Sequence, residues 1–199
     1  VLAAKREDSP DVDAVVAEII ADVRMRGDTA VIELTTKFDR LNLTADTLAF
    51  SREEILAHCA NVPAQERAAL ELAAERIRAY HARQMPENAS WVDASGATLG
   101  WRWTPVSAAG LYVPGGLASY PSSVLMNAIP AKVAGVGRLA ICVPKPGGLT
   151  NPLVLLAAQI AGVDEICRIG GAQAIAALAY GTETIVPVDK ITGPGNAFV

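Results

Sequence analysis

The chain has 199 residues, of which 51% are hydrophobic and 19% charged, a composition typical of a folded globular protein rather than a disordered one. Its net charge of −4 and the lack of any block of Lys or Arg argue against a nucleic-acid groove or an anionic membrane surface as its partner. No apolar run approaches the ~20 residues that a helix needs to span a bilayer.

The first third of the chain is predicted to be helical. Apolar residues recur at three- and four-residue spacing after Pro10, which predicts a helix that begins there and ends at Gly27. Ser51 and Glu54 form a capping box, which predicts a helix over residues 52–60. Two further helices are predicted, one from Asp28 and a longer one from Pro63.

Around Trp91 the periodicity of the sequence changes from that of a helix to that of a strand. Residues 91–93 and 98–103 alternate between apolar and polar side chains on either side of Ser95-Gly96. Two alternating runs joined by a short glycine-containing turn are typical of a β-hairpin. We therefore expect a hairpin between the helical region and the rest of the chain.

From Gly110 onward, short apolar strands alternate with helices. The predicted strands cover residues 111–113, 138–143, 165–169 and 188–191, and the predicted helices cover residues 122–134, 152–162 and 172–180. Such alternation predicts right-handed crossovers and a parallel sheet covered on both faces. The expected fold is α/β, with a helical N-terminal region followed by a Rossmann-like domain.

We divide the chain into two parts on this basis. Residues 1–108 are expected to belong to a first α/β domain that residues outside this chain complete, and residues 109–199 to a Rossmann-like, cofactor-binding domain. The sequence begins without methionine and stops in GPGNAFV, where a new element is expected to begin. We therefore expect it to be a piece of a longer protein.

The cysteines indicate a reducing compartment. Cys59, Cys142 and Cys167 are far apart and form no C-x-x-C pair, and the last two lie inside apolar, strand-like runs. Buried, reduced thiols of this kind are typical of cytosolic proteins. We expect a cytoplasmic location.

Glycine-rich turns follow three of the predicted strands, at 112–116 (YVPGG), 170–173 (GGAQ) and 193–196 (GPGN). In open α/β sheets ligands bind beyond the carboxyl ends of the strands, and glycine lets backbone amides approach a ligand closely. Ser122 or Ser123 is expected to cap the following helix, whose N-terminal end would favour an anion such as a pyrophosphate. Gln173 and Asn196 add side-chain amides that can donate and accept hydrogen bonds.

Taken singly, each of these turns is also explained by ordinary strand–helix turn chemistry. No G-x-G-x-x-G is present, because Phe198 stands where its third glycine would be. His58 and His81 lie on different predicted helices without partners at metal-ligand spacing, so no metal site is predicted in this chain. The residues by themselves predict an α/β ligand-binding module with an amide-lined edge.

The same turns lie in blocks that closely resemble the signature sequences of the histidinol dehydrogenase family. The blocks are GLYVPGGLASYPSSVLMNAIPAKVAGV, GGAQAIAALAYGTETI and VDKITGPGNAFV, in the order and spacing of that family, and the likeness extends into RGDTAVIELTTKFD. It covers essentially the whole chain.

This resemblance implies an enzyme that oxidises L-histidinol through histidinaldehyde to L-histidine, reducing two NAD in turn, in cytoplasmic histidine synthesis. It also implies a homodimer with one zinc ion per active site. Tyr112, Gln173 and Asn196 match the family's NAD-contacting positions. The family's acid–base pair and zinc ligands follow the GPGNA block, so they lie outside this chain, which is expected to be inactive alone.

Two other interpretations remain open at this stage. One is a related zinc-dependent alcohol dehydrogenase that acts on another small polar alcohol, since the substrate-contacting residues lie mostly outside the chain. The other is a non-catalytic α/β binding module. A Gln-x-x-His and a Glu-His pair in the following residues would exclude the second.

Overall fold

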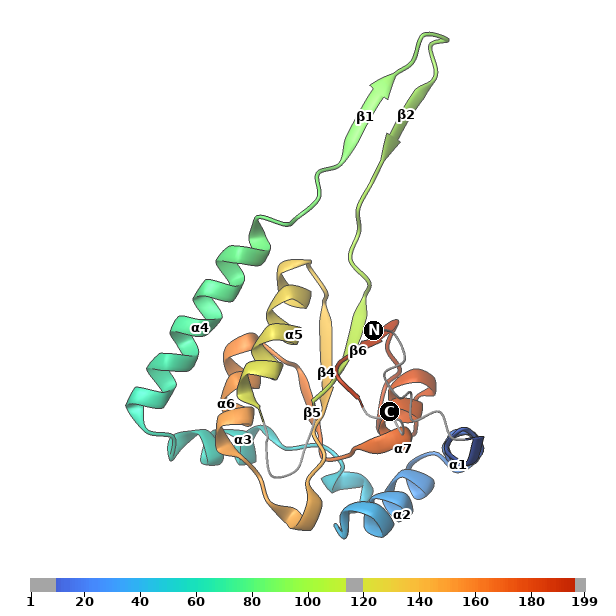
Figure 1. The fold of residues 1–199 in the computed structure, drawn as a ribbon, viewed down its shortest axis with the longest axis vertical. Coiled ribbons are helices and arrows are strands. Elements are labelled where there is room, and N and C mark those ends of the chain that lie inside the picture. The colour runs from blue at the N-terminus through green and yellow to red at the C-terminus, as the bar shows by residue number, and fades with distance from the viewer. Residues whose placement is uncertain (1–9, 114–119, 196–199) are drawn as a thin grey trace, which may run out of the picture.

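A four-stranded parallel sheet forms the centre of the protein in the computed structural model, which describes residues 10–113 and 120–195 (Figure 1). Its strands stand in the order β5-β4-β3-β6, and each neighbouring pair is parallel. Their bounds are β3 Ala108–Tyr112, β4 Arg138–Cys142, β5 Glu165–Cys167 and β6 Lys190–Thr192. The predicted α/β fold with a Rossmann-like parallel sheet is confirmed.

Helices cover both faces of this sheet (Figure 1). Helices α5 (Pro121–Val133) and α6 (Pro152–Ala161) pack on one face, and α7 (Gly171–Tyr180) packs on the other. Successive residues of a strand point to opposite faces. Leu111 of β3 accordingly lies in the core beneath α5 and α6, whereas Tyr112 lies in the core beneath α7.

The helices of the first hundred residues form an outer layer on the same two faces. Helices α1 (Pro10–Arg26) and α2 (Asp28–Asp39) contact α7, whereas α3 (Arg52–Ala60) and α4 (Ala64–Ala82) contact α6. Between them, Ala49 pairs with Cys167 in an antiparallel bridge at the free edge of β5. The division of the chain at residue 108 stays a prediction, and these helices build part of the same core.

The predicted hairpin is confirmed and projects from the body (Figure 1). Strands β1 (Ala89–Val92) and β2 (Thr98–Trp101) are antiparallel. One face of the ribbon carries Trp91 and Leu99, which pair across it, and Trp101, whose ring centroid lies 5.2 Å from that of Trp91. All three side chains are exposed, so this face is apolar and uncovered by the described residues.

The predicted capping box at the start of α3 is confirmed, and the predicted serine cap of α5 is wrong. The Ser51 Oγ accepts from the Glu54 amide at 3.2 Å while Glu54 Oε2 accepts from the Ser51 amide at 2.8 Å, and Asn151 caps α6 through the Leu153 amide. Neither Ser122 nor Ser123 caps α5. Because Pro121 takes the first helical position, Tyr120 becomes the cap residue and makes no side-chain cap bond.

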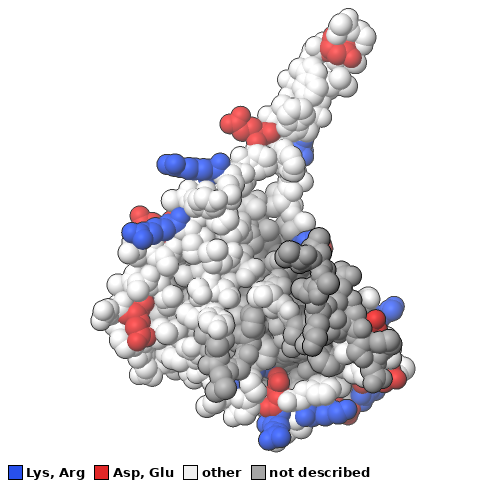
Figure 2. Space-filling model, in the orientation of Figure 1, with Lys and Arg blue, Asp and Glu red and all other residues white. Residues whose placement is uncertain are grey.

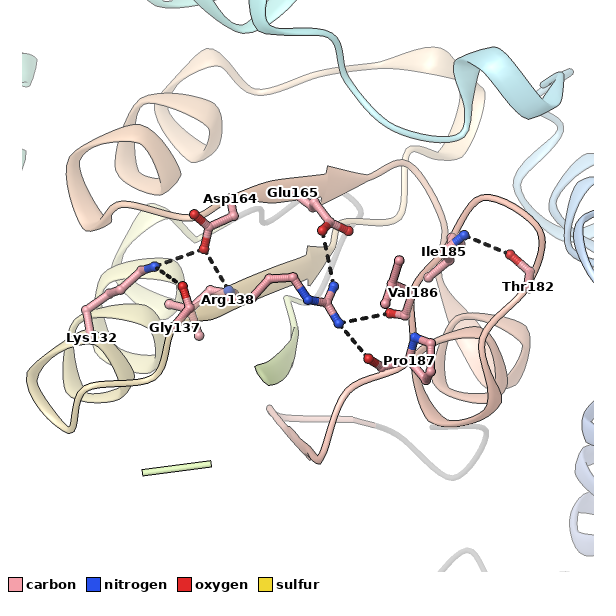
Figure 3. Close-up of polar contacts among 10 residues, drawn as sticks. Lys132, Gly137, Arg138, Asp164, Glu165, Thr182, Ile185, Val186 and Pro187 are labelled. Atoms are coloured by element: carbon pink, nitrogen blue, oxygen red, sulfur yellow. Dashed lines mark hydrogen bonds and ion pairs between the residues drawn. The ribbon is translucent and has the colours of Figure 1, made fainter. Parts of the chain in front are cut away.

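Ion pairs and hydrogen bonds connect the neighbouring elements at the edge of the sheet where β4 and β5 begin (Figure 3). Asp164 accepts from Lys132 at 2.9 Å and from the Leu139 amide at 2.8 Å. Arg138 contacts Glu165 at 3.1 Å and donates to the Pro187 carbonyl at 2.5 Å. These contacts tie β4 and β5 to neighbouring loops, so we interpret this edge as structural.

The outer surface gives no sign of a membrane span. No helix among the described residues is long and apolar enough to cross a bilayer. On the face drawn in Figure 2, acidic and basic residues are interspersed along the helices and the hairpin, and much of the described surface between them is uncharged.

Candidate functional site

The order of the strands locates a candidate site at the edge where the strands end. From β3 the chain moves through α5, β4 and α6 to β5, and then returns through α7 to β6 on the other side of β3. The helices therefore change face on either side of β3. Ligands of open α/β sheets bind at such a switch point, beyond the carboxyl ends of the strands.

Tyr112 ends β3 at this point. Its side chain is 7% exposed and crosses beneath α7, where its hydroxyl oxygen accepts a hydrogen bond of 3.1 Å from the Gly171 amide. Burial raises the pKa of Tyr112 above its ordinary value, although the bond from Gly171 opposes that change. Tyr112 is thus a neutral phenol that joins the end of β3 to the start of α7.

Gln173 lies beside the same glycine. Its side chain is 2% exposed, and a Cβ atom placed on Gly171 would lie 2.9 Å from Gln173 Oε1. The structure therefore brings Tyr112 and Gln173 together around Gly171, despite their separation in the sequence. Asn196, the third predicted NAD contact, lies outside the described residues. The assignment of all three to NAD stays a prediction.

Helix 122–134, whose N-terminal end was expected to favour an anion, lies on the other face of the sheet from this pair. Tyr112 and Gln173 lie on the α7 face of the sheet, whereas α5 covers the opposite face. Both side chains are also buried, so they pack around Gly171 at the end of the sheet and do not line an open cleft. The sequence could not show this, because the face on which Tyr112 lies depends on the register of β3.

The glycines near the strand ends make room for the protein itself. A Cβ atom on Gly170 would collide with the ring of Pro144, and one on Gly193 would collide with the backbone of Tyr112. At these two positions the interpretation that glycine leaves space for a ligand is corrected. The missing side chains let neighbouring loops pack backbone against backbone.

An anionic group fits the N-terminal end of α7. Gly170 is its cap residue and offers no side chain, while the Gly171 amide donates to the Tyr112 hydroxyl. The end of a helix carries a partial positive charge and directs amides at an anion. Among the described residues, this end of α7 is one part that suits the pyrophosphate of a dinucleotide.

A buried cation near the end of β5 was not predicted. Arg168 is 6% exposed; its Nη1 donates to the Thr47 carbonyl at 2.8 Å, and its Nη2 lies 2.5 Å from Glu54 Oε2. Its guanidinium carbon lies 4.0 Å from the centre of the Phe50 ring. From the sequence, Glu54 was explained by the capping box alone. The available signal was an arginine inside the apolar run EICRIG.

Zinc does not fit the described part of the chain. No three His, Cys, Asp or Glu residues come together there in a way that could hold a metal ion. His58 lies on α3 against Phe50, and His81 lies on α4 beside Tyr80. We therefore derive no chemical step through zinc from these residues.

The comparisons with known proteins decide the family. A profile described as histidinol dehydrogenase matches residues 2–199. The chain belongs to the histidinol dehydrogenase family. It is 77% identical over 198 residues to a histidinol dehydrogenase from Cereibacter sphaeroides and 79% identical to one from Ruegeria pomeroyi, covering 100% of this chain and 46% of each relative.

A solved structure of the histidinol dehydrogenase from Elizabethkingia anophelis has the same fold. It matches with a TM-score of 0.92 and 36% sequence identity, over 98% of this chain and 45% of that one. The chain thus spans about half the length of its histidinol dehydrogenase relatives.

Proposed function

We propose that the full-length protein is a zinc- and NAD-dependent enzyme that oxidises L-histidinol through histidinaldehyde to L-histidine in cytoplasmic histidine biosynthesis. The observation that supports this proposal is the family match over residues 2–199, with identities of 77% and 79% to relatives named histidinol dehydrogenase.

In this proposal the present chain supplies part of the cofactor cradle. The amides that follow Gly171 in the first turn of α7 would hold the pyrophosphate, and the hydrogen bond from Gly171 to Tyr112 keeps the start of α7 fixed against β3. Gln173 braces the same turn, and Asn196 would contact the cofactor directly. NAD, when bound, supplies the hydride acceptor, and the acid–base and metal groups would come from the rest of the polypeptide.

We further propose that the full-length protein is a homodimer. The exposed apolar face of the hairpin, formed by Trp91, Leu99 and Trp101, supports a larger assembly. An isolated two-stranded hairpin is marginally stable in water, so such a face is expected to be covered by other protein.

Turnover by the full-length protein tests the proposal. With L-histidinol it should reduce NAD and form about two NADH per histidine, because an alcohol and then an aldehyde are oxidised. The same preparation should contain about one zinc per chain, lose activity to a chelator, and scatter light as a dimer. Turnover of only unrelated alcohols would favour the related dehydrogenase, and absence of any turnover would favour a binding module.

Replacing Asn196 by alanine in the full-length protein tests the cofactor assignment. Loss of one neutral hydrogen bond should weaken NAD binding by about 0.5–1.5 kcal/mol, while L-histidinol binding changes much less. The measurement is the Kd of NAD from fluorescence titration. Asn61→Ala is the matched control, because Asn61 is exposed at the end of α3. Equal effects of the two substitutions would contradict the assignment.

A further inference from the structure

A half-buried lysine, Lys145, stands in the wall of a cavity of about 310 Å³ that opens where β4 ends and α6 begins. Most of this wall is apolar and includes Phe50, Pro144 and Val154. The Lys145 Nζ lies 5.6 Å from the centre of the Phe50 ring and makes no ion pair with a carboxylate among the described residues. Partial removal from water without such a partner disfavours the charged form of an amine.

A second cation lies against the same phenylalanine ring. The guanidinium carbon of Arg168 lies 4.0 Å from the centre of the Phe50 ring, and the carboxylate partner of Arg168 is the partly exposed Glu54 of α3. Burial, foremost, and the charge of Arg168 lower the pKa of Lys145 from its ordinary value, whereas the charge of Glu54 opposes that change. Among the described residues, these two charged groups therefore act on the amine in opposite directions.

The surroundings of Lys145 are those that make a lysine nucleophilic. Lysine is activated by apolar surroundings or by a neighbouring cation, and Lys145 has both. Lys132, by contrast, is paired with Asp164 at 2.9 Å. Lys37 also lies over a phenylalanine ring, with its Nζ 5.2 Å from the centre of Phe38, but it is exposed on α2. Lys37 is therefore a suitable reference for the reactivity of Lys145.

The cavity suits a small acyl group that carries an anion. The positive charges of Lys145 and Arg168 attract an anion, and the apolar wall accommodates a short hydrocarbon chain. Thr150 stands in the same wall, and its Oγ1 is buried without a hydrogen-bond partner among the described residues, so it can donate to an acyl oxygen. An acyl phosphate combines an electrophilic acyl carbon with a negatively charged leaving group.

We propose that Lys145 is a site of acylation by acyl phosphates. The Lys145 Nζ attacks the acyl carbon, a C–N bond forms, and the bond from that carbon to the phosphate oxygen breaks. Phosphate leaves with the electron pair of that bond, and the proton of the amine passes to water. The product is an uncharged amide, so the cavity loses one positive charge. This inference goes beyond the proposed dehydrogenase activity and does not depend on turnover of L-histidinol.

The test is incubation of the full-length protein with acetyl phosphate at pH 7.5, followed by mass spectrometry of its peptides over time. Lys145 should be acetylated at least about threefold faster than Lys37, because a lowered pKa leaves more of the amine neutral. Inorganic phosphate shares the anionic group but has no acyl carbon. It should slow the acetylation of Lys145 and leave that of Lys37 unchanged.

Glu54→Gln separates the effect of charge from that of exposure. It removes a charge that raises the pKa of Lys145, and glutamine can still complete the capping box with Ser51, so acetylation of Lys145 should become about twofold faster. Glu71→Gln, at an exposed position on α4, should leave the rate unchanged. Lys145→Arg should abolish the acetylated peptide and leave the rate at Lys37 as it was.

Three results would overturn the proposal. The first is acetylation of Lys145 that is no faster than that of Lys37. The second is equal slowing of both lysines by inorganic phosphate, because the anion would then have no place in the cavity. The third is a rate at Lys145 that Glu54→Gln leaves unchanged in the folded protein, because exposure alone would then govern the reaction.

Discussion

Gly193→Ala is expected to destabilise the full-length protein by about 2–4 kcal/mol, among the largest effects for a single methyl group in this chain. A Cβ atom there would lie 2.9 Å from both the backbone N and the backbone C of Tyr112, and closer still to its carbonyl oxygen. Those atoms belong to β3, which is paired on both sides and cannot move away. Gly193 also has φ near 145°, a conformation that favours glycine.

The change in urea midpoint measures this effect, with Gly96→Ala as the control. Gly96 also has a positive φ, at 88°, but no atom lies within 4 Å of its would-be Cβ. The control should therefore lose only about 1–2 kcal/mol of backbone strain. Because Gly193 contacts Tyr112, Gly193→Ala should also weaken NAD binding if the proposed site is correct. Equal losses for both variants would show that the contact with Tyr112 does not matter.

Local signals in the sequence predict much of this fold. Glycines and prolines mark where helices begin and end, as at Gly27 and Asn151-Pro152, because their effects on the backbone act within a few residues. The four strands of the sheet were predicted from apolar runs and are confirmed, with ends that shift by up to three residues. At β6 the shift arises because the Asp189 carboxylate and amide bond Ala108, which delays the start of the strand.

The site could be predicted only in part, because its geometry depends on contacts between distant residues. The sequence indicated which turns meet at one edge, and the structure brings Tyr112 and Gln173 together there. Nothing in the sequence indicated that Gly170 makes room for the ring of Pro144, which lies 26 residues earlier (170−144). The position of Arg168 over Phe50 could not be predicted for the same reason, since an isolated arginine just after a strand carries no information about its partner.

Glu54→Gln is expected to lower the stability of the full-length protein by about 1–2 kcal/mol at neutral pH. Glutamine can still complete the capping box with Ser51, so this substitution removes chiefly the charge. The lost partner is Arg168, a residue that is 6% exposed and whose charge would remain buried without a carboxylate. The loss is smaller than for a fully buried pair because the Glu54 side chain is 47% exposed.

The pH dependence of this loss distinguishes charge from packing. The hydrogen bond from the Ser51 amide, foremost, and the nearby Arg168 hold the pKa of Glu54 below its ordinary value, against the opposing effect of burial. The unfolded chain therefore binds the proton more tightly. The Glu54 carboxylate contributes its full stabilisation above the pKa of glutamate in the unfolded chain, about 4.3. This stabilisation is lost as the pH falls through the lower pKa of Glu54 in the folded state.

Urea midpoints of the parent and Glu54→Gln proteins, measured from pH 8 down to about pH 2.5, should differ by a constant amount above about pH 5 and converge as the pH falls through the lowered pKa of Glu54. Glu71→Gln, at an exposed position on α4, should show almost no difference at any pH. Adding Arg168→Met to Glu54→Gln should cost less than the sum of the two single changes, because both remove the same ion pair. A difference that stays constant down to about pH 2.5, or strictly additive losses, would show that the charge of Glu54 does not stabilise Arg168.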